Sequence, residues 1–263
     1  MKGLNEITID RVASSILTLL GVEKGEGMAE AIEELLALGR CDRVVMYNPD
    51  AVAEWIYEAH RDMFSPLLEE IDLNLEMKSM VPPVTPVCFA SMYTGLLPSI
   101  HGIEKYEKPV LKVKTAFDIL RENGRKVAIV STEGDSISKI FLERDLDYFI
   151  YRTKDECNRK ALELIDEDRY DLLVLYNGDY DWAMHRFSPE GKRSLRALGE
   201  NVETYMELKK AIEERWKGHR TALAFAPDHG CHRAYGILGS HGKEIPMDMN
   251  IRHFWSIIGE RDA

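Results

Sequence analysis

Residues 172–189 read LLVLYNGDYDWAMHRFSP and join an uninterrupted apolar run to a polar segment that contains aspartate and histidine. The run at 172–176 has no polar face, as expected for a strand that is buried on both sides of a parallel sheet. Similar runs lie at 43–47 (RVVMY), 126–131 (KVAIVS) and 221–226 (TALAFA). The four runs predict strands of one central sheet.

Helical patterns separate these runs. They span residues 115–123, 156–165 and 189–217, and the first and last end at Gly124 and Gly218. Strands and helices in alternation predict an α/β fold with a mostly parallel central sheet and helices on both faces. No repeat or flexible linker divides the sequence, so we expect a single domain over residues 1–263.

The charge balance limits the classes of partner. The chain has 263 residues, with 34 Lys and Arg against 45 Asp and Glu, and a formal net charge of −11. Proteins that bind nucleic-acid polymers or anionic membranes use clustered Lys and Arg, so we expect neither partner here. A small anionic substrate remains compatible with this acidity, because bound divalent cations reverse the local field.

The sequence predicts a cytoplasmic protein. No stretch approaches the roughly 18–20 apolar residues of a membrane span, and Glu6 and Asp10 come too early for a signal peptide. The four cysteines lack the short paired spacing of a zinc knuckle or a disulfide framework. We therefore expect reduced, mostly buried thiols.

Polar residues follow three of the four predicted strands. Asp50 follows the first, Asp181 follows the run at 172–176, and Asp228 with His229 follows the last. Ligands of open α/β sheets bind beyond the carboxyl ends of the strands. Each carboxylate alone could simply cap the next helix. Three such strand ends in one sheet favour a cation site.

The histidines add nitrogen ligands to these carboxylates. His185 lies four residues after Asp181, which places the two on one face of a helical turn. His241 lies in a Gly-Ser-His-Gly frame that lets an imidazole reach inward. The candidate ligands are Asp50, Asp181, His185, Asp228, His229 and His241. They suffice for two zinc sites with three protein ligands each and open positions. We interpret His60, His219 and His253 as ordinary structural histidines.

Residues 80–103, MVPPVTPVCFASMYTGLLPSIHGI, form a Pro-bounded and mostly uncharged segment that suits a backbone packed against a site. Thr85 is the candidate nucleophile of this segment. A threonine hydroxyl is a weak nucleophile at neutral pH, but metal coordination can remove its proton. The alternative is that Thr85 caps the helix that follows, and both roles are compatible.

Four motifs in order resemble the nucleotide pyrophosphatase/phosphodiesterase branch of the alkaline phosphatase superfamily. The nucleophile segment includes Thr85, residues 94–96 (TGL), Pro98 and residues 101–103 (HGI). The segment 181–189 (DWAMHRFSP) resembles the Asp and His metal motif of the branch, and 228–230 (DHG) and 239–242 (GSHG) resemble its two later motifs. The resemblance covers roughly residues 43–260.

The resemblance implies an alkaline phosphatase-like core and a phosphodiesterase that acts through a phosphothreonine intermediate on Thr85. One zinc would be held by Asp50, Asp228 and His229, with Thr85 as the substrate-side ligand. The other would be held by Asp181, His185 and His241. Manganese can occupy similar sites. The implied partner is a small phosphate-ester substrate, and the motifs specify neither its identity nor the oligomeric state.

The chain departs from the family pattern in three respects. Asn48 competes with Asp50 for the first ligand position, and we favour Asp50 because a carboxylate neutralises a cation. The phosphate-binding Asn expected after residues 101–103 is absent, so Lys105 or Tyr106 would replace it. Residues 9–22 also resemble a helix that the family places last, which suggests a circularly permuted order with this first helix beside the last strand.

Other functions remain open from the sequence. A phosphomonoesterase or a cofactor-independent phosphosugar mutase of the same superfamily would use the same metal scheme, although such mutases normally have an inserted cap domain. A sulfatase fits less well, because those enzymes need Cys or Ser where Thr85 stands. A catalytically silent metal-binding protein is the alternative from a different class.

Overall fold

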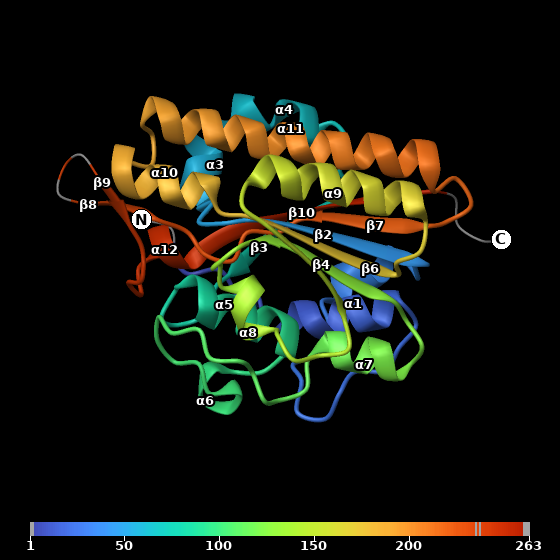
Figure 1. Cartoon of the computed structure of the whole chain (residues 1–263). Coiled ribbons are helices and arrows are strands. Elements are labelled where there is room, and N and C mark those ends of the chain that lie inside the picture. Colours follow the sequence, from blue (N-terminus) through green and yellow to red (C-terminus); the bar gives the residue numbers. More distant parts are fainter. Residues whose placement is uncertain (1–2, 235, 237, 260–263) are drawn as a thin grey trace.

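The computed structural model describes residues 3–234, 236 and 238–259 and is built around an eight-stranded sheet (Figure 1). The strand order is β1 (Ile7–Thr8), β3 (Leu73–Lys78), β10 (Asn250–Ile258), β7 (Thr221–Phe225), β2 (Arg43–Pro49), β6 (Leu172–Asn177), β4 (Val127–Thr132) and β5 (Asp147–Tyr151). β10 runs antiparallel to β3 and β7, and the other pairs are parallel. The predicted mostly parallel sheet is confirmed, and the four predicted strands are β2, β4, β6 and β7.

Helices cover both faces of this sheet, as predicted (Figure 1). One face has α3 (Glu54–Ala59), α4 (Ser65–Leu68), α9 (Lys154–Glu167), α10 (Asp179–Phe187) and α11 (Lys192–Arg215). The other has α1 (Arg11–Leu19), α5 (Thr85–Thr94), α6 (Pro98–His101), α7 (Ala116–Glu122) and α8 (Ile137–Ile140). The short helix α2 (Glu33–Ala37) packs against α1. Between α3 and α4 lies the short 3-10 helix η1 (Arg61–Phe64).

Local sequence signals account for the helix starts. Thr115 caps α7 and Thr153 caps α9, and each forms a capping box with the acidic residue three positions later. The predicted helix at 156–165 therefore begins two residues earlier, at Lys154. The predicted helix at 189–217 begins at Lys192, because Gly191 is extended and serves as the N-cap.

Each central strand contributes to two hydrophobic cores. Alternate residues of β2, such as Val44 and Met46, pack with α1, α5 and α7, whereas Val45 and Tyr47 pack with α9 and α11. All seven residues of β2 and all six of β6 are buried. Burial of both faces explains why these strands appear in the sequence as uninterrupted apolar runs.

The amino-terminal segment lies beside the last strand. Asn250, at the start of β10, accepts a hydrogen bond from the Asn5 backbone N–H (3.0 Å) and donates one to the Gly3 carbonyl (2.8 Å). α1 shares its hydrophobic core with Ile251 and Trp255 of β10. The adjacency that the permuted order requires is present, and the permutation itself stays a prediction.

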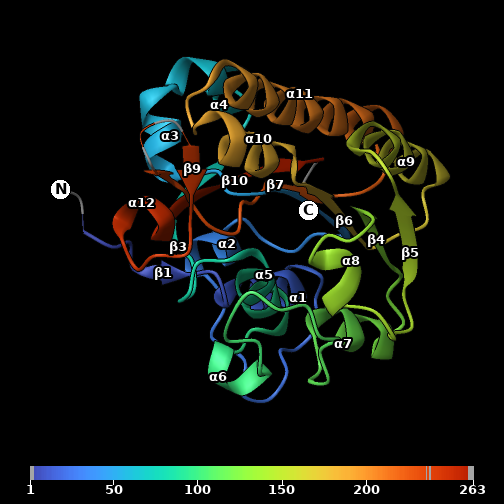
Figure 2. The same ribbon diagram turned by 60° about the vertical axis from the view of Figure 1, so that its left-hand side comes forward.

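The ligand-bearing loops lie at one end of the sheet, near α10 and α12 (Pro246–Met249), as Figure 2 shows. There β8 (His232–Ala234) pairs with β9 (Leu238–Ser240) in a separate antiparallel ribbon. All four cysteines are free and buried, as predicted. Among the described residues, no helix is both long and apolar enough to cross a membrane.

Candidate active site

The six candidate ligands converge at the carboxyl ends of the parallel strands. Asp50 follows β2, Asp181 and His185 lie on α10 after β6, and Asp228 and His229 follow β7. His241 directly follows β9. The structure brings them together in two groups of three whose ligand atoms lie within 4.8 Å of one another: Asp50, Asp228 and His229, and Asp181, His185 and His241.

The three residues of the first group are buried. His229 Nε2 lies 3.4 Å from Asp50 Oδ1 and 3.4 Å from Asp228 Oδ2. The loop after β2 turns sharply at Ala51, which has a positive φ of 62°, and the Ala51 N–H donates to Asp228 Oδ1 (3.3 Å). This turn brings two carboxylates from neighbouring strands against one imidazole.

The second group is more open. Asp181 Oδ1 lies 3.3 Å from His185 Nε2 and 3.4 Å from His241 Nε2. Asp181 and His185 meet because they are one helical turn apart on α10, as their spacing predicts. The His229 and His241 rings stack with centroids 4.1 Å apart, which makes the two groups direct neighbours.

Backbone carbonyls orient all three imidazoles. His185 Nδ1 lies 3.1 Å from the Gly239 carbonyl oxygen. His241 Nδ1 lies 3.1 Å from the Pro83 carbonyl oxygen, and His229 Nδ1 lies 2.9 Å from the Gly230 carbonyl oxygen. A carbonyl can only accept, so each Nδ1 carries the proton and each Nε2 presents a lone pair. Metal-binding histidines are typically oriented in this way.

The carboxylate oxygens that face these nitrogens have no hydrogen-bond donor. Asp50 Oδ1, Asp181 Oδ1 and Asp228 Oδ2 are buried and unpartnered within the described residues. Buried charged oxygens of this kind are costly unless a cation or a donor compensates them. The donor set of carboxylate oxygens and imidazole nitrogens therefore fits two divalent cations.

The electrostatics of the carboxylates agree with this fit. Burial, reinforced by the charge of Asp181, raises the pKa of Asp50 to about 6. Burial and the nearby Asp50 raise the pKa of Asp228 well above its usual range. Burial also acts to raise the pKa of Asp181, but the nearby imidazoles of His185 and His241 outweigh it and lower that pKa. Bound cations would remove the repulsion among these carboxylates.

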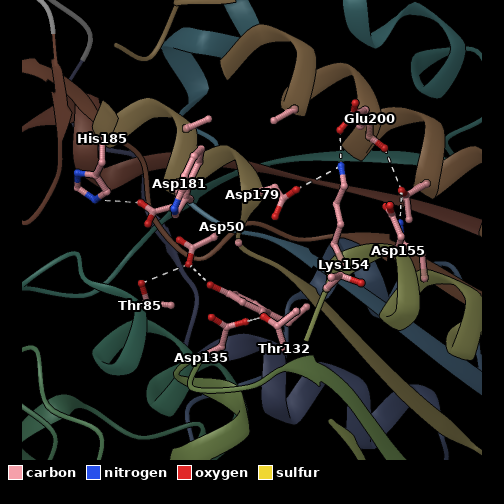
Figure 3. A pocket seen from close by; sticks show the side chains of 18 of the residues that line it. Asp50, Thr85, Thr132, Asp135, Lys154, Asp155, Asp179, Asp181, His185 and Glu200 are labelled. Carbon is pink, nitrogen blue, oxygen red and sulfur yellow. Dashed lines mark hydrogen bonds and ion pairs between the residues drawn. The ribbon is translucent and has the colours of Figure 1, made fainter. Parts of the chain in front are cut away.

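Thr85 lies against the first group (Figure 3). Its hydroxyl donates to Asp50 Oδ2 (3.3 Å) and lies 3.3 Å from His229 Nε2. Val84 is the N-cap of α5 and Thr85 is its first helical residue. The alternative that the Thr85 hydroxyl caps this helix is therefore wrong, because its partners are the two candidate ligands.

Asn48 does not enter the ligand group. Its side chain donates to the Ala226 carbonyl (2.7 Å) and accepts from the Tyr93 hydroxyl (2.6 Å). Asp50, two residues later, is the residue that joins Asp228 and His229. Tyr176, the last residue of the run at 172–176, is a site residue that was not predicted: its buried hydroxyl donates to Asp50 Oδ2.

The three histidines interpreted as structural have partners outside the two groups. His60 contacts Glu190 (3.0 Å), His219 contacts Arg43 (3.0 Å), and His253 contacts the Pro227 carbonyl (2.8 Å).

An open cavity of about 1190 Å³ lies above the candidate ligands. Its lining includes Asp50, Thr85, Asp181 and His185. Of the two residues expected to bind phosphate, Tyr106 lines this cavity, whereas Lys105 is exposed and paired with Glu107 (3.3 Å) outside the lining. Lys108, which the sequence analysis did not consider, lines the cavity.

One known family matches part of the chain. Residues 47–120 match the sequence model of the family described as type I phosphodiesterase/nucleotide pyrophosphatase. The matched segment contains Asp50 and Thr85. No curated protein sequence matches the chain.

Solved structures share the fold at low sequence identity. An inactive murine ectonucleotide pyrophosphatase/phosphodiesterase 5 in complex with AMP is 13% identical, with 73% of this chain and 58% of that chain covered and a TM-score of 0.59. The human protein of the same name is 11% identical, with 82% and 88% covered and a TM-score of 0.62. Phosphonoacetate hydrolase from Sinorhizobium meliloti, in complex with phosphonoformate, is 16% identical, with 74% and 59% covered and a TM-score of 0.56.

The chain thus spans 58% of the length of the murine structure. The match of residues 47–120 and the shared fold confirm the resemblance to the nucleotide pyrophosphatase/phosphodiesterase-like branch of the alkaline phosphatase superfamily.

Proposed function

We propose that the protein is a metal-dependent phosphoric ester hydrolase of the phosphodiesterase type, with Thr85 as its nucleophile. The observation that supports this most directly is the Thr85 hydroxyl, 3.3 Å from both Asp50 Oδ2 and His229 Nε2 at the floor of the open cavity. A nucleophile needs to be close to the group that activates it and open to substrate. Thr85 meets both requirements.

Two divalent cations complete the proposal. Asp50, Asp228 and His229 would hold one, and Asp181, His185 and His241 the other, with zinc as the expected metal and manganese as the alternative. Such cations, when bound, lower the pKa of a coordinated hydroxyl and neutralise charge on the oxygens of the reacting phosphate.

The residues of the chain then have distinct roles. Thr85 Oγ1 forms a bond to phosphorus while the bond to the leaving oxygen breaks, and water later hydrolyses the phosphothreonine. Tyr176, by donating to Asp50 Oδ2, holds that carboxylate in place. The position of Thr85 on the first turn of α5 fixes its hydroxyl at the cavity floor.

Hydrolysis of bis(p-nitrophenyl) phosphate tests this proposal, with p-nitrophenyl phosphate measured in parallel. We expect activity that chelation abolishes and zinc or manganese restores. Thr85→Ala should lower turnover at least about 10³-fold while the metal content stays unchanged, because the nucleophile is lost and all six ligands remain. Near wild-type turnover in Thr85→Ala would exclude Thr85 as the nucleophile.

The same assay separates the alternatives. Preference for p-nitrophenyl phosphate would indicate a phosphomonoesterase. Two unreacted substrates in the presence of bound metal would favour a phosphosugar mutase or a catalytically silent metal-binding protein. The expected partner is a small phosphate ester, and the cytoplasmic location remains a prediction that fractionation of the source cells would test.

A further inference from the structure

Cationic side chains line the cavity in addition to the candidate metal ligands. Its cationic lining residues are Lys108, Arg152, Lys154, Arg186, Arg193 and Arg196. Lys154 is already paired with both Asp179 and Glu200 (Figure 3), and Arg196 is paired with Glu200. Cations that are already paired contribute little to the binding of a further anion. The unpaired ones are therefore the candidates for contact with a phosphate group.

Lys108 is the unpaired cation that lies on the Thr85 side of the cavity. It belongs to the segment between α6 and α7, on the same face of the sheet as α5. Arg186 and Arg193 lie on α10 and α11, and Arg152 lies between β5 and α9, so the other unpaired cations belong to or directly precede helices of the opposite face (Figure 1). Its ammonium donates to the Gly134 carbonyl (2.9 Å) in the loop after β4. The next residue of that loop, Asp135, lines the cavity together with Asp50.

Neighbouring groups position the ammonium of Lys108, but they do not accept all of its hydrogen bonds. It lies 5.4 Å from the centroid of the Tyr106 ring, which restricts its position, and Gly134 accepts one of its three possible hydrogen bonds. Within the described part of the chain, no carboxylate forms an ion pair with it. Its charge acts on the nearby Asp135 carboxylate without forming an ion pair with it. Two of its donors are therefore available to a ligand.

We propose that Lys108 binds the non-bridging oxygens of the substrate phosphate, in the role that the sequence analysis gave to Lys105 or Tyr106. This inference rests on the proposed function. Tyr106 then serves as the aromatic support of the Lys108 ammonium. A phosphate monoester carries one more negative charge on these oxygens than a diester, so Lys108 favours monoesters over diesters by simple Coulomb attraction. Lys108 thus contributes more to the binding of a monoester than to that of a diester.

Lys108→Gln is the test variant, and Lys105→Gln is its matched control, because Lys105 lies three residues earlier and outside the cavity lining. Binding of inorganic phosphate to the zinc-loaded protein is measured by calorimetry, beside kcat/KM for both p-nitrophenyl substrates and the metal content. We expect Lys108→Gln to weaken phosphate binding about 10- to 100-fold, the loss typical of a hydrogen bond to a charged group. It should lower kcat/KM for the monoester more than for the diester, and Lys108→Arg should restore part of both.

Equal phosphate affinity in Lys108→Gln and Lys105→Gln would overturn the proposal. So would equal losses for the two esters with unchanged phosphate binding, because that result would mean that Lys108 only pins the Gly134 loop. If Lys108→Gln folds poorly, Lys108→Met, which keeps the apolar stem against Tyr106, takes its place. A wild-type protein that hydrolyses neither ester would count against the proposed function, and the phosphate titration would still decide the role of Lys108.

Discussion

At the scale of single residues, the chemistry of the site depends on which atom each side chain presents. The sequence identifies Asp and His at suitable spacing, but it does not show that the Gly239, Pro83 and Gly230 carbonyls fix all three imidazoles with Nε2 toward the carboxylates. Those carbonyls come from loops distant in the chain or from backbone turns, and only the folded chain brings them into place. The ligand types could therefore be predicted, and their orientation could not.

Asp135 gives a prediction about stability and pH. Burial, reinforced by the charge of Asp50, raises the pKa of Asp135 from 3.8 to about 7. The unfolded chain loses this proton near pH 4 and the folded chain only near pH 7, so the folded state loses stability as the pH rises through this window. Asp135→Asn keeps an acceptor for the Thr132 hydroxyl and removes the penalty. We expect the metal-free variant to be more stable than the wild type by roughly 2–4 kcal/mol at pH 8, and equally stable near pH 4.

Urea unfolding of the metal-free proteins at the two pH values measures this difference. Glu133→Gln is the control, because Glu133 is exposed in the same loop and its replacement should change the free energy of unfolding by less than about 0.5 kcal/mol. A stability gain of Asp135→Asn that is the same at both pH values would contradict the explanation by titration.

At the scale of elements, the second ligand group depends on close packing of β9 against α10. Gly239 of β9 has no room for a side chain, since a Cβ there would lie 2.5 Å from Met184 Sδ and 2.7 Å from the Met184 carbonyl oxygen. The same residue provides the carbonyl that orients His185, and His241 follows two positions later. The contact between ribbon and helix therefore sets the geometry of all three side chains in that group.

Gly239→Ala should separate β9 from α10. We expect a loss of about 1–3 kcal/mol in the free energy of unfolding, as for other overpacked sites. Zinc bound per chain should fall from two toward one, because the Asp50 group has no residue on the ribbon. Elemental analysis after dialysis measures this ratio. Gly218→Ala is the control, since a Cβ at Gly218 meets no atom within 4 Å; an unchanged zinc ratio in Gly239→Ala would refute the dependence on the ribbon.

The elements themselves were predictable to different extents. The sequence predicts the central strands β2, β4, β6 and β7, because helices cover both faces of these strands and nearly all of their residues are apolar. β5, at the sheet edge, has no fully buried residue, and β10 contains Asn250, Arg252 and His253. Those polar residues are accommodated by partners such as Glu76 and the Pro227 carbonyl, which lie far away in the sequence. A pattern of local hydrophobicity does not reveal such partners, so these strands were missed.

At the scale of the whole molecule, the candidate ligands connect elements that are far apart in the chain. Each ligand-bearing segment belongs to a different part of the chain: Asp50 follows β2, Asp181 lies in the first turn of α10, Asp228 follows β7 and His241 follows β9. Ligands that bind the folded chain and not the unfolded one stabilise it by mass action. Metal binding should therefore act on the stability of the entire fold.

Chelation should lower the thermal midpoint of unfolding. Occupancy of one site at 100 times its dissociation constant contributes about 2.7 kcal/mol, which corresponds to roughly 5–10 °C for a domain of this size. Differential scanning calorimetry with and without chelator, followed by return of zinc, measures the effect. Zinc should raise the thermal midpoint of the Asp228→Ala variant less than that of the wild type. A wild-type midpoint that does not change on chelation would contradict the metal assignment.

The β8–β9 ribbon also has a kinetic consequence. Within residues 3–234, 236 and 238–259, this two-stranded sheet pairs with no strand of the main sheet, whereas β2 and β7, which precede Asp50 and Asp228, are paired on both sides. Hydrogen exchange should therefore be rapid in the ribbon and slow in these central strands. His241 directly follows the ribbon, whereas Asp50 and Asp228 follow central strands. We therefore expect the Asp181 group to exchange its metal faster than the Asp50 group.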